Sequence, residues 1–366
     1  MNAHSYSISL SFSFVNPFSG NIFIFHAFDI GDEVNLDKVK LSSSLIQRPY
    51  IPPKYFKNYH IPLSIDLPHP HSTSKFQSCK IHSFGAISLT YKIPFQDSLE
   101  NIREKLSKIY EDYQEESSKN ASSVYKKISN DTIKPKFFNT RASYLVIQVD
   151  PQLDKIDAMK LKEQFGGIIA SMVRFETETL SEYQKNEILE DAIGYFRGDM
   201  IIVDPESAFI YDDEYEEVLD LFEFSNLQEL QLKYFDWILD QQLNLAYEGK
   251  NIRLPLKAYL PFIRTPWKGP VADIEKLRVD ISVITERLES SIKIVRESYF
   301  TELYSLLVEK LDLNGWHNSI NRKLNILSEI RAVFQHKIDA IREDLLSILI
   351  IILIFIELMV AILKKG

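Results

Sequence analysis

Residues Leu345 to Leu363 read LLSILIIILIFIELMVAIL, and this stretch decides the architecture expected for the whole chain. Its about 19 residues would rise roughly 28 Å as an α-helix, close to the ~30 Å hydrocarbon core of a bilayer. Apolar side chains lie on every side of such a helix, whereas a helix in the core of a soluble domain normally keeps a polar stripe. The pattern predicts a single transmembrane helix, with a buried core helix as the alternative.

Glu357 is the one ionisable residue inside this predicted span. A carboxylate at that depth costs on the order of 2.5 to 3.5 kcal/mol or more. We therefore expect Glu357 to be protonated, to pair with another membrane helix, or to reach the headgroups beside Lys364 and Lys365. Only Lys364, Lys365 and Gly366 follow the span, which indicates a tail-anchored protein that contacts membrane lipid through residues 345–363.

The bulk of the chain is expected in the cytosol. Cys79 is the only cysteine, so no internal disulfide can form, and a reducing compartment is the simpler interpretation. The segment from Met1 to Phe28 has no Lys or Arg ahead of its apolar residues, and Tyr6, Ile8, Leu10, Phe12 and Phe14 alternate as in a strand. This pattern is typical of a strand rather than of a secretion signal.

Composition is that of a globular protein with room for about two domains of the usual ~100 to 200 residues. The chain has 366 residues, of which 45% are hydrophobic and 25% charged, and its formal net charge is -9. Binding along a nucleic-acid backbone needs a surplus of Lys and Arg on one face. We therefore expect no direct nucleic-acid partner.

Residues 1–250 are expected to form a mixed α/β head domain that ends in a long helix. Strand patterns occur at Ile22 to Phe28, Ile81 to Pro94 and Tyr144 to Val149. The prolines of residues 48–72 predict a loop without a regular element. Helical spacing covers Asp97 to Ser129 and Asp154 to Phe175, and Ser181 with Gln184 predicts a helix start. Asp204-Pro205 predicts the turn of a β-hairpin between residues 200–203 and 208–211, and Glu214 to Tyr247 has the spacing of one amphipathic helix.

A different organisation follows. Residues 251–271 read as a proline-containing connector, and residues 272–344 contain two heptad-like series separated by Asn314-Gly315. We expect an antiparallel, coiled-coil-like helical hairpin whose second arm runs directly into the membrane span at 345–363. From Trp316 to Leu363 this arm, with the span included, has about 48 residues and would be roughly 72 Å long. The predicted fold class is thus α+β: a mixed α/β head, a helical hairpin stalk and one C-terminal transmembrane helix.

Acidic residues gather between Asp199 and Glu217 and could bind a hard divalent cation through oxygen ligands. The competing interpretation places Asp212 to Glu217 at a helix start, where exposed N–H groups and the helix dipole stabilise negative charge. The members of this acidic group are Asp199, Asp204, Asp212, Asp213, Glu214, Glu216 and Glu217.

Two further sets of polar residues have side chains that could bind a ligand. The histidines His60, His69, His71 and His82 surround the proline-rich segment, where surface positions are favoured over a zinc site because no helix-spaced pair supports one. A polar row on the long helix, which could carry a ligand contact or a structural hydrogen-bond network, comprises Asn226, Gln228, Gln231, Asp236 and Asp240.

Several stretches in order resemble a family of proteins of unknown function, the Required-for-Meiotic-nuclear-Division type. They are SFGAIS at 83–88, the run at 168–189, GYFRGDMIIVDPESAFIYD at 194–212, FSNLQELQLKYFDWILD at 224–240, the Trp316, Ser319, Lys323 and Leu324 pattern, and the apolar helix with Glu357. Departures at Gly194-Tyr195, Gly198-Asp199 and Ser225-Asn226 weaken any transfer of roles to Asp199 or Asn226. The resemblance implies a membrane-anchored, oligomer-forming protein without established enzymatic activity.

The function expected from the sequence is a tail-anchored scaffold or tether. Its head would bind an unidentified protein partner, and the chain would form a homo-oligomer with Glu357 helping to pair membrane helices. We expect no cofactor, no resident metal and no catalytic residues, because a Gly-rich phosphate loop, a zinc-protease helix motif and a nucleophile elbow are all missing from the sequence. The alternative is a membrane-associated, metal-dependent hydrolase that uses the acids from Asp199 to Glu217. Sensing of a lipid or small ligand by the head is a third hypothesis that no residue pattern selects.

Overall fold

The computed structural model describes residues 17–41, 45–56, 60–67, 76–138, 140–151, 157–248, 274–291 and 298–364. The chain divides into two compact units. The head unit contains Met1–Leu230 and Ile292–Leu311, and the helical unit contains Gln231–Ser291 and Asp312–Gly366. The alternating residues from Tyr6 to Phe14 and the connector at 251–271 lie outside the described residues.

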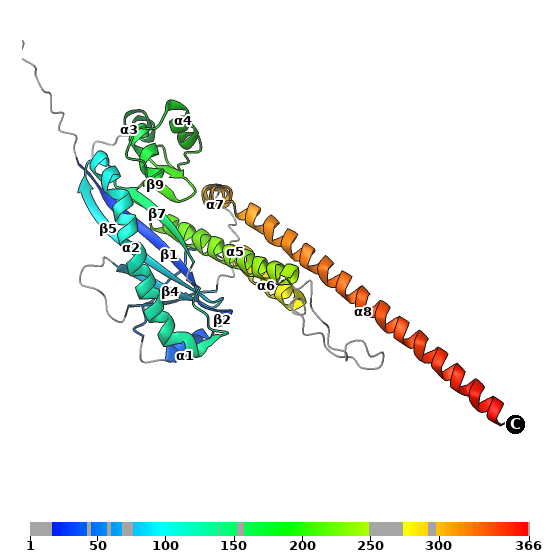
Figure 1. Ribbon diagram of the computed structural model, residues 1–366. Helices are drawn as coiled ribbons and strands as arrows, with labels where there is room; N and C mark the ends of the chain where they lie inside the picture. Colours follow the sequence, from blue (N-terminus) through cyan, green and yellow to red (C-terminus); the bar gives the residue numbers. More distant parts are fainter. Residues whose placement is uncertain are drawn as a thin grey trace, which may run out of the picture. The chain divides into compact units, whose positions relative to one another are not determined.

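A seven-stranded mixed sheet organises the head unit (Figure 1). Its strand order is β3-β4-β5-β1-β7-β9-β8, and every neighbouring pair is antiparallel except β7 and β9. The strands are β1 (Phe18–Asp29), β3 (Leu63–Ile65), β4 (Phe76–His82), β5 (Ala86–Asp97), β7 (Arg141–Val149), β8 (Met200–Val203) and β9 (Ser207–Tyr211). The α+β prediction, with a mixed-sheet head, is confirmed.

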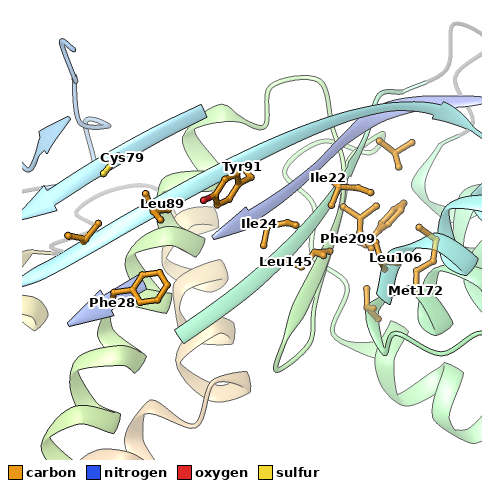
Figure 2. Packing of buried hydrophobic residues seen from close by; sticks show 14 of the residues in the cluster. Ile22, Ile24, Phe28, Cys79, Leu89, Tyr91, Leu106, Leu145, Met172 and Phe209 are labelled. Atoms are coloured by element: carbon orange, nitrogen blue, oxygen red, sulfur yellow. The ribbon is translucent and has the colours of Figure 1, made fainter. Parts of the chain in front are cut away.

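One face of this sheet, the α2 face, is covered by three helices. They are α2 (Leu99–Ile128), α3 (Ala158–Val173) and α4 (Glu182–Glu190). Figure 2 shows Ile22, Ile24, Leu145 and Phe209 of the sheet in one apolar layer with Leu106 of α2 and Met172 of α3. Alternate residues of a strand point to opposite faces, so β1 contributes its even-numbered residues from 22 to 28 to this core.

The opposite face, the α5 face, receives the first half of α5 (Glu216–Glu248). Ser88, Ala27 and Ala142 form one row across β5, β1 and β7. Two small side chains in that row leave room for the helix, and the ring of Phe222 stacks on Tyr144 at 5.5 Å. The predicted long helix is confirmed, although its first half lies in the head unit and its second half in the helical unit.

Local signals placed most head elements correctly. The hairpin around Asp204-Pro205 forms β8 and β9, and the Ser181 hydroxyl accepts the Gln184 N–H at 3.3 Å as the N-cap of α4. Gly85 turns the chain between β4 and β5 with φ 83°, and a Cβ there would lie 1.7 Å from the carbonyl oxygen of Gly31. Only glycine accepts both conditions.

Part of the proline-rich segment was misjudged. Residues 48–72 were expected to contain no regular element, yet β3 pairs antiparallel with β4 inside that range. The three-residue strand lies after Pro62, at the edge of the sheet, where a neighbouring proline removes no ladder hydrogen bond from a central strand. A smaller two-stranded sheet pairs β2 (Glu33–Val34) with β6 (Thr132–Ile133), next to α1 (Leu36–Leu41) and the short 3-10 helix η1 (Ser129–Asp131).

Helix α7 (Ser298–Lys310) groups with the head unit, whereas the heptad pattern had placed these residues in the stalk. Its buried residues Tyr299, Phe300, Leu303 and Leu307 form an apolar stripe. The ring of Phe300 lies 4.6 Å from that of Tyr55, and the Tyr304 hydroxyl donates to Gln228 Oε1 at 3.0 Å. These contacts fix α7 within the head.

The helical unit contains the second half of α5, α6 (Ile274–Ser291) and α8 (Leu313–Leu363), with α6 packed along α8. The helical path is interrupted at Asp312, which has φ 49° and separates α7 from α8. The predicted interruption at Asn314-Gly315 lies instead in the first turn of α8. Helix α8 is one 51-residue helix, long and apolar enough at its C-terminal end to cross a membrane. The prediction of a long C-terminal helix of this kind is confirmed.

Candidate functional site

The acidic group between Asp199 and Glu217 is divided by the β8-β9 hairpin. Met200 pairs with Tyr211 and Val203 with Ala208, so Asp199 and Asp212 flank one end of the hairpin and Asp204 lies at the other. Five residue steps from Asp199 to Asp204 separate the two ends by roughly 16 Å at ~3.3 Å per residue. Among the residues that the structure describes, no three His, Cys, Asp or Glu side chains converge as metal ligands.

Asp204 is the most buried of these acids, at 5% exposure. Its Oδ2 lies 3.0 Å from Nε of Arg174, and its backbone carbonyl accepts the Tyr144 hydroxyl at 2.7 Å. Burial raises the pKa of Asp204 to about 6, and the charge of Arg174 offsets part of that shift. The side chain closes the hairpin turn against the head.

Asp199 and Asp212 serve backbone geometry. The Asp199 carboxylate accepts the Phe196 N–H at 3.0 Å, and the Asp212 carboxylate accepts the Glu214 N–H at 2.9 Å. Glu216 and Glu217 occupy the first turn of α5, where the helix dipole favours negative charge. Each of these carboxylates thus has a local structural role.

A cluster of buried polar and charged side chains connects β4, β5 and α5. The sequence alone did not predict this cluster. We call it the head network: Tyr50, Lys80, Ser88, Asp220 and Glu223. Lys80 Nζ lies 2.5 Å from Glu223 Oε2 and 3.0 Å from Asp220 Oδ1, and 4.2 Å from the centre of the Tyr50 ring. The Ser88 hydroxyl donates to the other Glu223 oxygen at 2.6 Å, and the Tyr50 hydroxyl donates to Asp220 at 3.1 Å.

The electrostatics of the head network favour a fixed ion pair. Burial opposes ionisation of Glu223, but Lys80 and the hydrogen bonds from Lys80 and Ser88 hold its pKa below the ordinary value. Burial raises the pKa of Asp220, and Lys80 opposes that rise. Lys80 lies between two carboxylates and an aromatic ring. Its ammonium group therefore attaches α5 to the sheet through ion pairs and is not a free amine nucleophile.

His82 contradicts the surface assignment given to the histidines near the proline-rich segment. It lies in β4 at 1% exposure, with its ring 5.0 Å from that of Phe84, while His60 is exposed and His69 and His71 lie outside the described residues. Both ring nitrogens of His82 are buried, and neither has a hydrogen-bond partner among the residues that the structure describes. Burial lowers the pKa of His82 to about 3, so the ring is neutral at pH 7. Strand alternation places it beside Lys80 on the α5 face.

His26 is a second buried histidine, on the α2 face, that sequence reasoning did not single out. Its Nδ1 lies 2.7 Å from the Ser143 hydroxyl, and burial together with Arg141 lowers its pKa to about 3. A neutral imidazole facing a serine hydroxyl has the composition of a nucleophilic dyad. Such a low pKa makes His26 a weak base, so we assign this pair to the sheet interior.

The polar row predicted on α5 is divided between the two units. Asn226 and Gln228 lie in the head and are buried, with Asn226 Nδ2 donating to the Ala142 carbonyl at 3.4 Å and Gln228 accepting from Tyr304. Gln231, Asp236 and Asp240 lie in the helical unit. One row on the helix therefore belongs to two separate structural environments.

Asp236 and Asp240 form the helical-unit network with Ser319 and Lys323 of α8. Lys323 Nζ lies 2.7 Å from Asp236 and 2.6 Å from Asp240, and the Ser319 hydroxyl donates to Asp236 at 2.9 Å. The two carboxylates are one helical turn apart, so a single ammonium reaches both. Ser319 and Lys323 are two residues of the pattern that suggested the family resemblance.

Glu357 lies in the apolar end of α8, and the span is not buried against any part of the described chain. An open pocket of about 570 Å³ is lined by residues of β2, α1, η1 and β6, with Ser83, and contains none of the predicted site residues. The pocket and the apolar helix are thus separate from the buried networks.

The fold and these networks define a class: an α+β head with internally paired charges and a long C-terminal helix that could cross a membrane. The chain belongs to the family described as "Uncharacterized protein MJ0711, N-terminal domain", whose model matches residues 19–217. It is 25% identical over 207 residues to the uncharacterised protein MJ0711 of Methanocaldococcus jannaschii, covering 54% of this chain.

The chain spans 59% of the length of that relative. No solved structure matches the chain. These comparisons support a family of uncharacterised proteins, and they give no support for the Required-for-Meiotic-nuclear-Division family in particular.

Proposed function

We propose that this protein is a membrane-anchored tether whose head binds a protein partner and whose helical unit holds the head away from the bilayer. The observation that carries the proposal is the division of α8. Its first half has buried residues at Leu313, Ile320, Leu324, Leu327 and Ile338, whereas its last part is apolar and exposed. One continuous helix thus has a first half that packs against other helices in water and a last part that could lie in a membrane.

The water-side part of α8 supports a spacing role. From Leu313 to Asp344 the helix would measure about 48 Å at 1.5 Å per residue. Its buried residues from Leu313 to Leu327 follow steps of seven, four and three, as in a coiled coil, and Ile338 follows eleven residues later. Lys323 also ties α8 to α5 through Asp236 and Asp240.

The head supports the partner-binding part. The family match, residues 19–217, falls within the head, so this is the part that the chain shares with its relatives. Anchoring is proposed from the apolar end of α8 alone, without the Required-for-Meiotic-nuclear-Division resemblance.

A cytosolic head is the orientation we propose. Cys79 is buried in β4, and burial raises its pKa, which leaves it an unreactive thiol with no need for an oxidising compartment.

The geometry of the acidic residues does not favour a metal-dependent hydrolase. The hairpin places Asp204 roughly 16 Å from Asp199 and Asp212 at ~3.3 Å per residue. The described carboxylates there are occupied by Arg174 and by backbone N–H groups.

Fractionation of cells that express the full chain tests the anchor. We expect the protein in the membrane pellet, resistant to alkaline carbonate, and released only by detergent. Replacing Ile351 and Phe355 together by Lys costs roughly 2.5 to 3.5 kcal/mol per lysine in the span and should move the chain to the soluble fraction.

Val333→Lys is the matched control, because Val333 is exposed earlier on the same helix. It should leave the protein in the membrane pellet. Unaltered full-length protein in the soluble fraction without detergent would remove the tether proposal.

A further inference from the structure

All the small or polar residues of the membrane span lie on one side of α8. The residues from 345 to 363 are Leu, Ile, Phe, Met or Val except Ser347, Glu357 and Ala361. At about 100° per residue these three positions fall within an arc of about 80°. Ile350 and Ile354 lie in the same arc, and we call the set Ser347, Ile350, Ile354, Glu357 and Ala361 the membrane stripe.

The membrane stripe differs from the side of α8 that the chain already uses. The buried residues of its first half, from Leu313 to Ile338, centre on a direction about 130° away at about 100° per residue. Helix α6 packs along that first half, and nothing in the described chain covers the span itself. The stripe is therefore open to another molecule in the bilayer.

The chemistry of Glu357 favours a partner there. In hydrocarbon no water can satisfy a carboxyl group, so ionisable residues in membrane helices pair with one another or face a protein interior. A neutral carboxyl donates one hydrogen bond and accepts another. The stripe offers no second polar group on its own helix at hydrogen-bond spacing, because Ser347 is ten residues, nearly three turns, from Glu357.

From these observations we infer that two copies of this chain pair in the membrane through the membrane stripe, with the two Glu357 carboxyls hydrogen-bonded to each other. The inference rests on the proposed anchor and specifies its partner. A parallel two-fold pair places the same residue of each copy at the same depth. Ser347 and Ala361 allow the two backbones to approach on either side of Glu357, as small residues do between membrane helices.

Disulfide crosslinking of the full chain in native membranes tests the pairing. In a Cys79→Ala background, single cysteines replace Ile350, Ile354 or Ala361 on the stripe, and Ile348, Ile352 or Met359 on the other side as matched controls. With oxidant, we expect the stripe cysteines to give at least tenfold more covalent dimer than the controls. Equal crosslinking at all six positions, or none at the stripe, would overturn the inference.

Substitution of Glu357 gives a second reading that does not depend on cysteine. Glu357→Leu should weaken self-association of detergent-extracted protein by about 3- to 30-fold, and Glu357→Gln, which keeps a donor and an acceptor, should retain most of it. A monomer in the membrane fraction, unchanged by Glu357→Leu, would mean that Glu357 reaches the headgroups beside Lys364. That result would overturn the pairing and leave the anchor standing, whereas a soluble chain would contradict the anchor.

Discussion

At the scale of single residues, the buried ion pair of Lys80 and Glu223 decides how α5 sits on the sheet. Breaking a buried pair by removing one partner leaves an unpaired charge in the interior, which costs about 3 to 5 kcal/mol. We expect Lys80→Met to lower the free energy of unfolding by that amount, because Glu223 and Asp220 then lose their cation. Chemical denaturation of the full chain in detergent measures it.

A double variant separates charge from packing. Lys80→Met with Glu223→Leu removes both partners and should recover most of the loss, since apolar replacement of a whole buried pair is often close to neutral. Lys119→Met, at an exposed pair with Glu115, should change stability by less than about 1 kcal/mol. If the double variant were as unstable as the single one, the pair would not be the source of the loss.

His82 predicts a specific pH dependence. Its pKa is about 3 in the folded protein against 6.5 for an ordinary histidine, so below pH 6.5 the unfolded chain binds a proton that the folded chain does not. Stability therefore falls as pH falls through 6.5 toward 3, by about 2 kcal/mol for this residue between pH 7 and 5. His82→Leu should change the free energy of unfolding little at pH 7, and it should remove the His82 contribution to the loss of stability at acid pH.

Denaturation midpoints at pH 7 and pH 5 check the histidine. His26 has the same direction of shift, so the variant will keep a second, similar dependence. His60→Leu, at an exposed position, is the control and should follow the unaltered protein at both pH values. A variant that lost as much stability as the unaltered protein between the two pH values would contradict the assignment.

At the scale of elements, α7 is the helix whose place the heptad pattern missed. We expect Phe300→Ala to cost about 3 to 5 kcal/mol, as for other buried phenylalanines, because its ring packs on Tyr55 in the head. Glu302→Ala, exposed on the same helix, should stay within about 0.5 kcal/mol.

Hydrogen exchange locates the effect of Phe300→Ala. Faster exchange should appear in β8 and α7, which contact each other in the head. Faster exchange confined to α6 and α8 would instead place α7 with the helical unit.

Sequence periodicity gave most elements because their causes are local. The Ser181 cap, the Asp204-Pro205 turn and the apolar run from Tyr144 to Val149 each depend on residues within a few positions. Local patterns could not reveal α7, because the three- and four-residue steps of the stalk continue through Tyr299. They could not reveal the head network either, since Lys80 and Glu223 are 143 residues apart and meet only when α5 crosses the sheet.

At the scale of the whole molecule, the tether proposal predicts that the head lies on the cytosolic side of the membrane. Protease added to sealed vesicles whose cytosolic face is outward should digest the head and spare a fragment of the membrane helix. Vesicles of the opposite orientation should protect the head until detergent is added. Protection in the first preparation alone would reverse the orientation without removing the anchor.

The position of β1 at the centre of the sheet has a consequence for synthesis on the ribosome. β1 is made before both of its neighbours, since β5 follows it and β7 ends about 120 residues later. At roughly 5 to 20 residues per second, the edge of this apolar strand that pairs with β7 waits about 6 to 24 seconds for its partner. The nascent chain should therefore depend on a holding chaperone during the first half of its translation, long before its membrane helix emerges.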